Sequence, residues 1–245
     1  ECRRSDGGFT ASRALLEKAR ALLAGAKRPL ILAGGGVKNS RCGEAVLDLA
    51  ALLEAPVVTS PGHGDAVSCN HRLYAGQVGP RGNAVASDLA KRADVILALG
   101  TRLGFNTTFY TYDNLNKDAR IIQVESEPTA IGRFFPVEVG VLAAAGDVTR
   151  DLVAALSGHE PAKEVTDWTN TFVAARAALL EQRDADAGEG TDPLQPGFLF
   201  KTLRKVIPDD AMFTMDAGTL CLQATDNMRY VRPPSLFTPL DFGLV

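Results

Sequence analysis

Five short apolar runs alternate along the chain with stretches that repeat apolar residues at helical spacing. Each run is continuously apolar, which is typical of strands whose two faces are both buried. The alternation of such strands with helices predicts a parallel sheet covered by helices on both faces. The expected strands are Leu30–Ala33, Pro56–Thr59, Val95–Leu99, Ile121–Glu125 and Glu138–Leu142.

The helices expected between and after these strands complete one doubly wound α/β domain over residues 12–183. Asp147 is expected to cap the helix that follows the last strand, because an aspartate side chain accepts hydrogen bonds from the first helical amides. The helices are predicted at Ser12–Ala26, Cys42–Glu54, Asn83–Arg92, Val148–Leu156 and Trp168–Arg183.

A polar, glycine-containing stretch follows this domain, and we expect residues 184–196 to form an exposed linker. A second βα unit begins beyond it, with helices at Gly197–Val206 and Thr219–Asn227 and a strand at Ala211–Met215. One strand and two helices cannot bury their own apolar faces. We therefore expect residues 197–245 to be the truncated start of another α/β domain, which docks on the first domain, pairs with a second copy of the chain or frays.

The bulk composition restricts the class of protein. The 245 residues are 46% hydrophobic and 22% charged, with a formal net charge of −3. These values are ordinary for a soluble globular protein and offer no electrostatic reason to expect nucleic acid as a partner. No apolar run approaches the ~20 residues needed to span a bilayer, so no membrane segment is expected.

The cysteines and the first residues of the chain bear on its location. The four cysteines are scattered, form no C-x-x-C pair and are accompanied by three histidines. This pattern predicts no metal site and fits the reducing cytoplasm. The first residues contain no apolar segment of the kind found in signal peptides. They also lack an initiator methionine, so we expect the chain to begin inside a longer protein.

Three consecutive glycines, Gly34–Gly36, follow the first expected strand. Glycines at a turn between a strand and a helix let backbone N–H groups approach a diphosphate, and the start of a helix adds partial positive charge. The spacing is not the G-x-G-x-x-G pattern of dinucleotide-binding folds. A tight turn without a ligand therefore stays open as the alternative.

Further residues leave alternatives of the same kind. The aromatic residues Phe105, Phe109, Tyr110 and Tyr112 follow the third expected strand, where they either stack on a ligand ring or cover the end of the sheet. Arg102 either binds a ligand or pairs with a surface carboxylate. His63 and His71 lie in a polar stretch and are expected to be exposed to solvent.

Six segments occur in an order that is informative as a set: Arg28–Gly36, Pro56–Ser60, Gly79–Asn83, Ala93–Arg102, Ile121–Pro128 with Ile131–Gly132, and Gly146–Val148. Together they resemble the central domain of thiamine-diphosphate-dependent enzymes of the acetolactate synthase type. Asp210–Gly218 resembles the entry to the C-terminal, thiamine-diphosphate-binding domain of that family. The resemblance covers nearly the whole chain from about residue 12.

The resemblance implies a nucleotide site in the central domain, for FAD or ADP. Gly104 and Asn106 stand where the FAD-binding pattern has an acidic residue and an arginine, so FAD, ADP and an empty crevice all stay open. Carried over by position, the contacts fall on Gly34, Gly35, Gly36, Gly79, Arg81, Gly100, Thr101, Arg102, Glu125 and Asp147, and those to thiamine diphosphate on Gly218 and Thr219.

The same resemblance implies the function of the full-length protein. It would be a carboligase or decarboxylase, hence a transferase or lyase, acting on 2-oxo acids with thiamine diphosphate and Mg²⁺, and assembled as a homodimer or homotetramer. The family's activating glutamate and its Gly-Asp-Gly metal motif have no counterpart here, so we expect no catalytic residue and no activity in this chain alone. The alternatives are a non-catalytic nucleotide-binding α/β module and a regulatory scaffold with a degenerate site.

Overall fold

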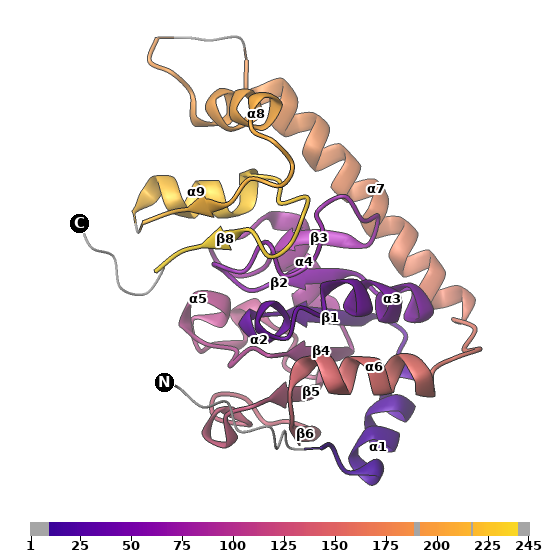
Figure 1. Ribbon diagram of the computed structural model, residues 1–245. Helices are drawn as coiled ribbons and strands as arrows, with labels where there is room; N and C mark the ends of the chain where they lie inside the picture. The colour runs from indigo at the N-terminus through magenta and orange to yellow at the C-terminus, as the bar shows by residue number, and fades with distance from the viewer. Residues whose placement is uncertain (1–9, 189–191, 217, 240–245) are drawn as a thin grey trace, which may run out of the picture.

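A parallel sheet of six strands forms the centre of the molecule (Figure 1). The computed structural model describes residues 10–188, 192–216 and 218–239. The strand order β3-β2-β1-β4-β5-β6 places β1 and β4 side by side in the middle of the sheet. The strands are β1 (Pro29–Ala33), β2 (Val57–Thr59), β3 (Tyr74–Gln77), β4 (Val95–Leu99), β5 (Arg120–Glu125) and β6 (Val139–Leu142).

Helices cover both faces of this sheet because successive strand residues bury side chains on opposite sides. Ile31 and Leu97 belong to one apolar cluster, whereas Leu32 and Ala98 belong to the other. The predicted doubly wound α/β fold is therefore confirmed. The first face is covered by α1 (Arg13–Ala24), α2 (Gly35–Asn39), α3 (Gly43–Leu53) and α6 (Ala145–Ala155), and the second by α4 (Ala84–Arg92) and α7 (Lys163–Asp186).

Strand β3 was not predicted from the sequence. It has only four residues, and Gly76 in its middle has a φ of +100°, a backbone conformation that is rare in strands. The register against β2 also shifts between Val57 and Val58, so apolar alternation is lost there. The short elements α5 (Phe105–Thr108), η1 (Tyr112–Asn114) and η2 (Pro128–Ala130) were likewise not predicted.

The expected capping role of Asp147 is wrong. Helix α6 begins at Ala145 with Ala144 in the capping position, so Asp147 lies inside the first turn. Its carboxylate is exposed and pairs with Arg150 one turn later, at 2.6 Å. A carboxylate in the first turn still favours the helix electrostatically.

Residues beyond α7 form a small unit with its own apolar cluster around Phe200, Tyr230 and Leu236. Helix α7 continues to Asp186, three residues into the segment expected to be a linker. The unit contains α8 (Pro196–Val206), β7 (Phe213–Thr214), α9 (Thr219–Asn227) and β8 (Leu236–Phe237). Strands β7 and β8 pair in parallel as a second, two-stranded sheet.

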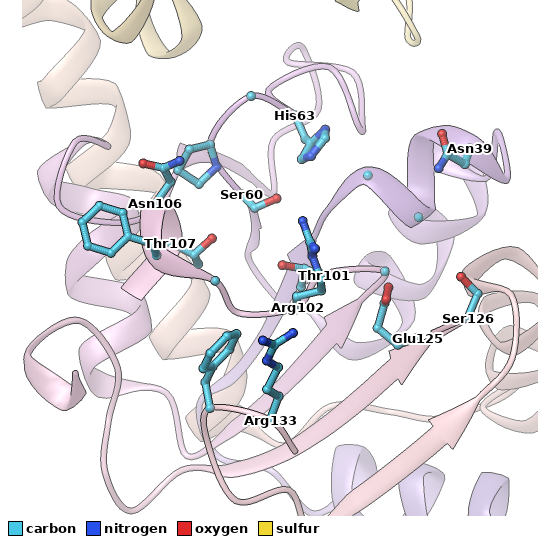
Figure 2. A pocket seen from close by; sticks show the side chains of 18 of the residues that line it. Asn39, Ser60, His63, Thr101, Arg102, Asn106, Thr107, Glu125, Ser126 and Arg133 are labelled. Atoms are coloured by element: carbon cyan, nitrogen blue, oxygen red, sulfur yellow. The ribbon is translucent and has the colours of Figure 1, made fainter. Parts of the chain in front are cut away.

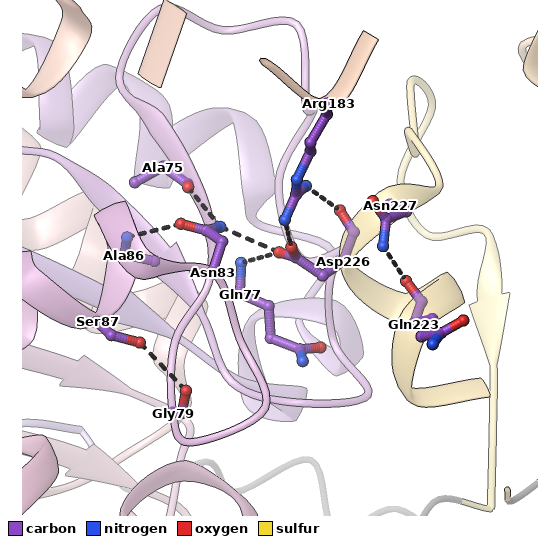
Figure 3. A network of polar contacts seen from close by, with 10 residues as sticks. All are labelled: Ala75, Gln77, Gly79, Asn83, Ala86, Ser87, Arg183, Gln223, Asp226 and Asn227. Carbon is purple, nitrogen blue, oxygen red and sulfur yellow. Dashed lines mark hydrogen bonds and ion pairs between the residues drawn. The ribbon is translucent and has the colours of Figure 1, made fainter. Parts of the chain in front are cut away.

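This small unit docks on the central domain, which is one of the three outcomes left open by the sequence. Figure 3 shows the contact, at which Asp226 of α9 reaches the edge of β3. The Asp226 Oδ1 atom accepts hydrogen bonds from the backbone of Gln77 at 3.1 Å and from the Asn83 side chain at 3.0 Å. Its Oδ2 atom pairs with Arg183 of α7. Asp226 thus accepts a hydrogen bond from the Gln77 amide, which lies on the edge strand of the sheet.

Close contact between glycine backbones joins the turns after β1 and β4. The amide of Gly34 donates to Leu99 at 2.9 Å, and the amide of Gly36 donates to Gly100 at 3.0 Å. A Cβ atom at Gly36 would lie 2.5 Å from the Cα atom of Gly100, so no larger residue fits. Gly100 also has a φ of +57°. Packing within the protein thereby accounts for the glycines at positions 34 and 36.

We expect Gly100→Ala to lower the free energy of unfolding by about 2–5 kcal/mol. The new Cβ atom would overlap Gly36, and alanine would also be strained in the left-handed backbone conformation of this position. Denaturant-induced unfolding measures the change. Gly104→Ala is the matched control, since its φ is −74° and, in the described part of the chain, no atom outside its immediate neighbours lies within 4 Å of its Cβ position. It should change stability by less than about 1 kcal/mol. Equal unfolding midpoints for the two variants would contradict the packing argument.

Candidate functional site

A cleft of about 730 Å³ lies beyond the carboxyl ends of the central strands (Figure 2). The chain leaves β1 for β2 on one side and β4 for β5 on the other, so a crevice forms between their turns. Residues from the turns after β1, β2, β4 and β5 line it, and the C-terminal unit contributes Thr238 and Pro239. The cleft is therefore at the position where open α/β sheets bind ligands.

Three charged side chains lie around this cleft. Arg102 and Arg133 are exposed, whereas Glu125 at the end of β5 is only 9% exposed. Figure 2 shows the three side chains directed towards a common space. Burial raises the pKa of the Glu125 carboxyl, and the nearby Arg102 guanidinium partly opposes that shift. Two cations and one partly desolvated carboxylate suit a ligand that carries both an anionic group and hydroxyl groups.

Aromatic side chains form one wall of the cleft. Phe105 and Tyr110 line it and are about half exposed, at 49% and 50%. The Tyr110 ring lies 4.3 Å from that of Phe134, and the Arg133 guanidinium lies 5.2 Å above the same Phe134 ring. Tyr112 instead contacts the buried Phe135 edge-on. Phe105 and Tyr110 thus face the cleft, whereas Tyr112 packs on a buried residue of the central domain.

The cleft brings together six of the residues expected to bind a nucleotide. Gly34 lies behind them, where a Cβ atom would overlap Gly100 and Thr101. Gly79 and Arg81 follow β3, Asp147 lies in α6, and Gly218 and Thr219 lie at the start of α9, all outside the cleft lining. The six residues in the lining are Gly35, Gly36, Gly100, Thr101, Arg102 and Glu125.

Several lining residues were not predicted, among them Arg133 and Ser60. His63, expected in solvent, is half-buried and lines the cleft, and a Cβ atom at Gly35 would lie 3.0 Å from its ring. His71 is also half-buried, and burial lowers its pKa. Both exposure predictions are wrong. The C-terminal unit packs on the loop that holds His63, as in the hydrogen bond from the Cys69 amide to the Tyr230 carbonyl oxygen, whereas His71 lies near Arg72 and Asp48 of the central domain. No local sequence signal reports such a long-range contact.

Comparison with known proteins agrees with this geometry. Residues 16–152 match the family model described as "Thiamine pyrophosphate enzyme, central domain". The chain belongs to this family. The resemblance inferred from the sequence is thereby confirmed.

The similarity to individual relatives extends along the chain beyond the residues matched by the family model. The chain is 33% identical to sulfoacetaldehyde acetyltransferase of Castellaniella defragrans over 93% of its own length and 41% of the relative. It is 34% identical to the enzyme of that name from Rhodobacter capsulatus, over 94% and 42%. It is 27% identical to the acetolactate synthase isozyme 3 large subunit of Escherichia coli, over 85% and 36%. The chain thus spans about two fifths of the length of these relatives.

Metal ligands and membrane spans were also considered. The described residues contain no group of three or more histidine, cysteine, aspartate or glutamate side chains arranged to hold a metal ion. None of the helices in the described part of the chain has the length and apolar character needed to cross a membrane.

The raised pKa of Glu125 predicts a pH dependence of stability. A buried carboxyl whose pKa is higher in the folded than in the unfolded state stabilises the fold while protonated, and this contribution is lost as pH rises through the folded pKa. The stability of Glu125→Gln relative to the unsubstituted protein should therefore increase between pH 4 and pH 7. Unfolding in denaturant at several pH values measures the difference.

Glu127 provides a control of opposite sign two residues away. Hydrogen bonds from the Thr129 side chain and backbone lower its pKa. This contribution to stability is present at neutral pH and is lost as pH falls through the folded pKa. Glu127→Gln should thus become less stable, relative to the unsubstituted protein, as pH rises. The same pH trend in both variants would contradict the assigned burial of Glu125.

Proposed function

We propose that this chain is the central part of a thiamine-diphosphate-dependent transferase or lyase that acts on small carbonyl compounds. The observation that carries the proposal is the extent of the similarity, which covers more than nine tenths of the chain and continues past residue 152 into the C-terminal unit. A protein that shared only a nucleotide-binding α/β fold with these enzymes would not be expected to resemble them in sequence in the C-terminal unit.

Two substrate classes are candidates. Relatives named sulfoacetaldehyde acetyltransferase are 30–34% identical, and those named acetolactate synthase are 27–29% identical. The higher identities favour acetyl transfer involving a small aldehyde. Carboligation or decarboxylation of a 2-oxo acid is the second candidate. Assembly as a homodimer or homotetramer and a location in the cytoplasm stay predictions for the full-length protein.

The C-terminal unit is the proposed contributor to the thiamine diphosphate site. Gly218 has a φ of +129° and precedes α9, and none of the described residues other than its chain neighbours has an atom within 4 Å of its Cβ position. The turn from Gly218 to Thr219 is therefore open enough for a diphosphate to approach the backbone. Bound thiamine diphosphate supplies an electron sink for a carbanion at the substrate carbonyl carbon. We assign Mg²⁺ to the full-length enzyme and to none of the described side chains.

The cleft of the central domain is the proposed nucleotide site, for ADP or FAD. Its volume lies within the roughly 300–1,000 Å³ of small-molecule sites. The guanidinium groups of Arg102 and Arg133 suit phosphate oxygens, and the Glu125 carboxylate at a strand end suits ribose hydroxyls. The exposed faces of Phe105 and Tyr110 suit a flat ring.

Arg102→Gln should weaken the binding of ADP or FAD by about 10–100-fold, because it removes a charge-assisted hydrogen bond to phosphate. Isothermal titration calorimetry gives the dissociation constant. Arg81→Gln is the matched control, since Arg81 is an exposed arginine outside the cleft lining. Its affinity should stay within about twofold of the unsubstituted chain. A larger loss for Arg81→Gln than for Arg102→Gln would move the site to the end of β3.

The catalytic proposal is tested on the protein expressed from its full gene. With thiamine diphosphate and Mg²⁺ present, it should consume sulfoacetaldehyde or pyruvate, and omission of thiamine diphosphate should abolish consumption. The 245-residue chain under the same conditions should show no turnover. Nucleotide binding by the full-length protein without consumption of either substrate would favour a non-catalytic nucleotide-binding module instead.

A further inference from the structure

One wall of the cleft does not belong to the central domain. Thr238 and Pro239 line it from the segment that follows β8, about a hundred residues beyond Glu125, Arg133 and Phe134. Figure 1 shows β8 lying across the end of the sheet, over the region of α2 and β2. A ligand in the cleft therefore lies between the sheet and the C-terminal unit.

A buried carboxylate holds this segment in place. The Asp65 side chain is fully buried, and its Oδ2 atom accepts hydrogen bonds from the amides of Ser235 at 2.8 Å and Leu236 at 2.7 Å. Its Oδ1 atom lies 2.8 Å from the Lys38 ammonium, which also donates to the carbonyl oxygen of Leu236. Because the Asp65 carboxylate is fully buried, loss of these charge-assisted bonds would leave it unpaired, so the geometry of the segment depends on both side chains.

Both halves of this Asp65–Lys38 anchor sit on elements that also line the cleft. Lys38 lies in the short helix α2, between the lining residues Gly36 and Asn39. Asp65 follows the lining residue His63 by two positions in the loop after β2. A ligand that orders α2 and this loop thus orders the two groups that hold β8.

The described part of the C-terminal unit has an apolar cluster of its own, separate from the two clusters of the central domain. Within the described residues, its sheet consists of two strands of two residues each, and its apolar cluster contains five buried residues. Besides the anchor, the unit is held by the polar contacts of Asp226 at β3. It is also held by hydrogen bonds from the Cys69 amide to Tyr230 and from the Ser68 hydroxyl to Val231, in the loop that carries Asp65. Small units with few buried apolar contacts open locally at a lower free energy than the core.

We propose that nucleotide occupancy of the cleft and docking of the C-terminal unit are coupled through the Asp65–Lys38 anchor. The nucleotide thereby controls the position of the turn at Gly218 and Thr219 in the proposed thiamine diphosphate site. This inference rests on the proposed nucleotide site. Because binding free energies are reciprocal, loosening the anchor must also weaken the nucleotide.

Hydrogen exchange on the unsubstituted chain tests the first direction. The amides of Phe213 and Met215 donate to the carbonyl oxygens of Ser235 and Phe237, so they report on β7–β8 pairing without lining the cleft. Saturating ADP, or FAD in a parallel sample, should slow their exchange by about 5–150-fold. Unchanged exchange in nucleotide-saturated protein would overturn the coupling and leave the nucleotide site intact. Failure of both nucleotides to bind would overturn the site and the coupling together.

Asp65→Asn tests the reverse direction. The substitution keeps the side-chain shape but removes the charge that pairs with Lys38. ADP affinity should fall about fivefold or more, because only the docked fraction of the protein binds tightly. Asp88→Asn is the matched control, since Asp88 is an exposed aspartate of α4 that pairs with Arg92. Circular dichroism checks that both variants are folded. Equal ADP affinities for the two folded variants would overturn the coupling.

Discussion

The direct contact between the backbones of Gly36 and Gly100 determines the geometry of the whole carboxyl end of the sheet. β1 and β4 are adjacent, and their turns leave in opposite directions around the cleft. No side chain separates the two turns, so the N–H group of Gly36 reaches the carbonyl oxygen of Gly100 directly. The following residues, Thr101 and Arg102, are consequently held at a fixed distance from α2. The cleft owes its shape to this constraint.

The sequence left two roles open for the glycines, and the structure shows close packing of two chain segments at Gly34 and Gly36. Glycine after a strand is compatible with a diphosphate and with close packing of two chain segments. Two of the three amides at Gly34–Gly36 are already hydrogen-bonded within the protein. The ligand chemistry of the cleft therefore comes mainly from side chains. Arg102, Arg133 and Glu125 supply the charges, and Phe105 and Tyr110 supply the flat surfaces.

Buried carboxylates join the C-terminal unit to the central domain, beside the packing of Val231 against the first apolar cluster. The carboxylates of Asp226 and Asp65 are both deeply buried. Asp226 of the C-terminal unit accepts a hydrogen bond from the Gln77 amide of β3, and Asp65 of the central domain accepts one from the Ser235 amide of the C-terminal unit. A buried carboxylate that loses a partner is strongly destabilising, so each of these contacts favours a single relative position of the two units. Such contacts specify geometry more than they add stability. They suit two units whose relative placement matters for chemistry between them.

Much of the fold followed from local pattern. The strand Val95–Leu99 and the helix Thr219–Asn227 have the predicted bounds, because continuous apolar runs and helical periodicity are local properties. The order of six short motifs was enough to predict the family. Six of the residues that the family resemblance implied for a nucleotide site lie in the cleft lining, where turns after parallel strands converge at one edge of the sheet.

Tertiary structure decided the rest. β3 could not be predicted, because pairing with β2 and the Asp226 contact compensate for a glycine in its middle. His63 is half-buried only because distant residues cover its loop, and Thr238 reaches the cleft only because Asp65 anchors β8. These placements depend on contacts between residues more than a hundred positions apart. Periodicity and spacing carry no information about such contacts, which arise only when the chain has folded.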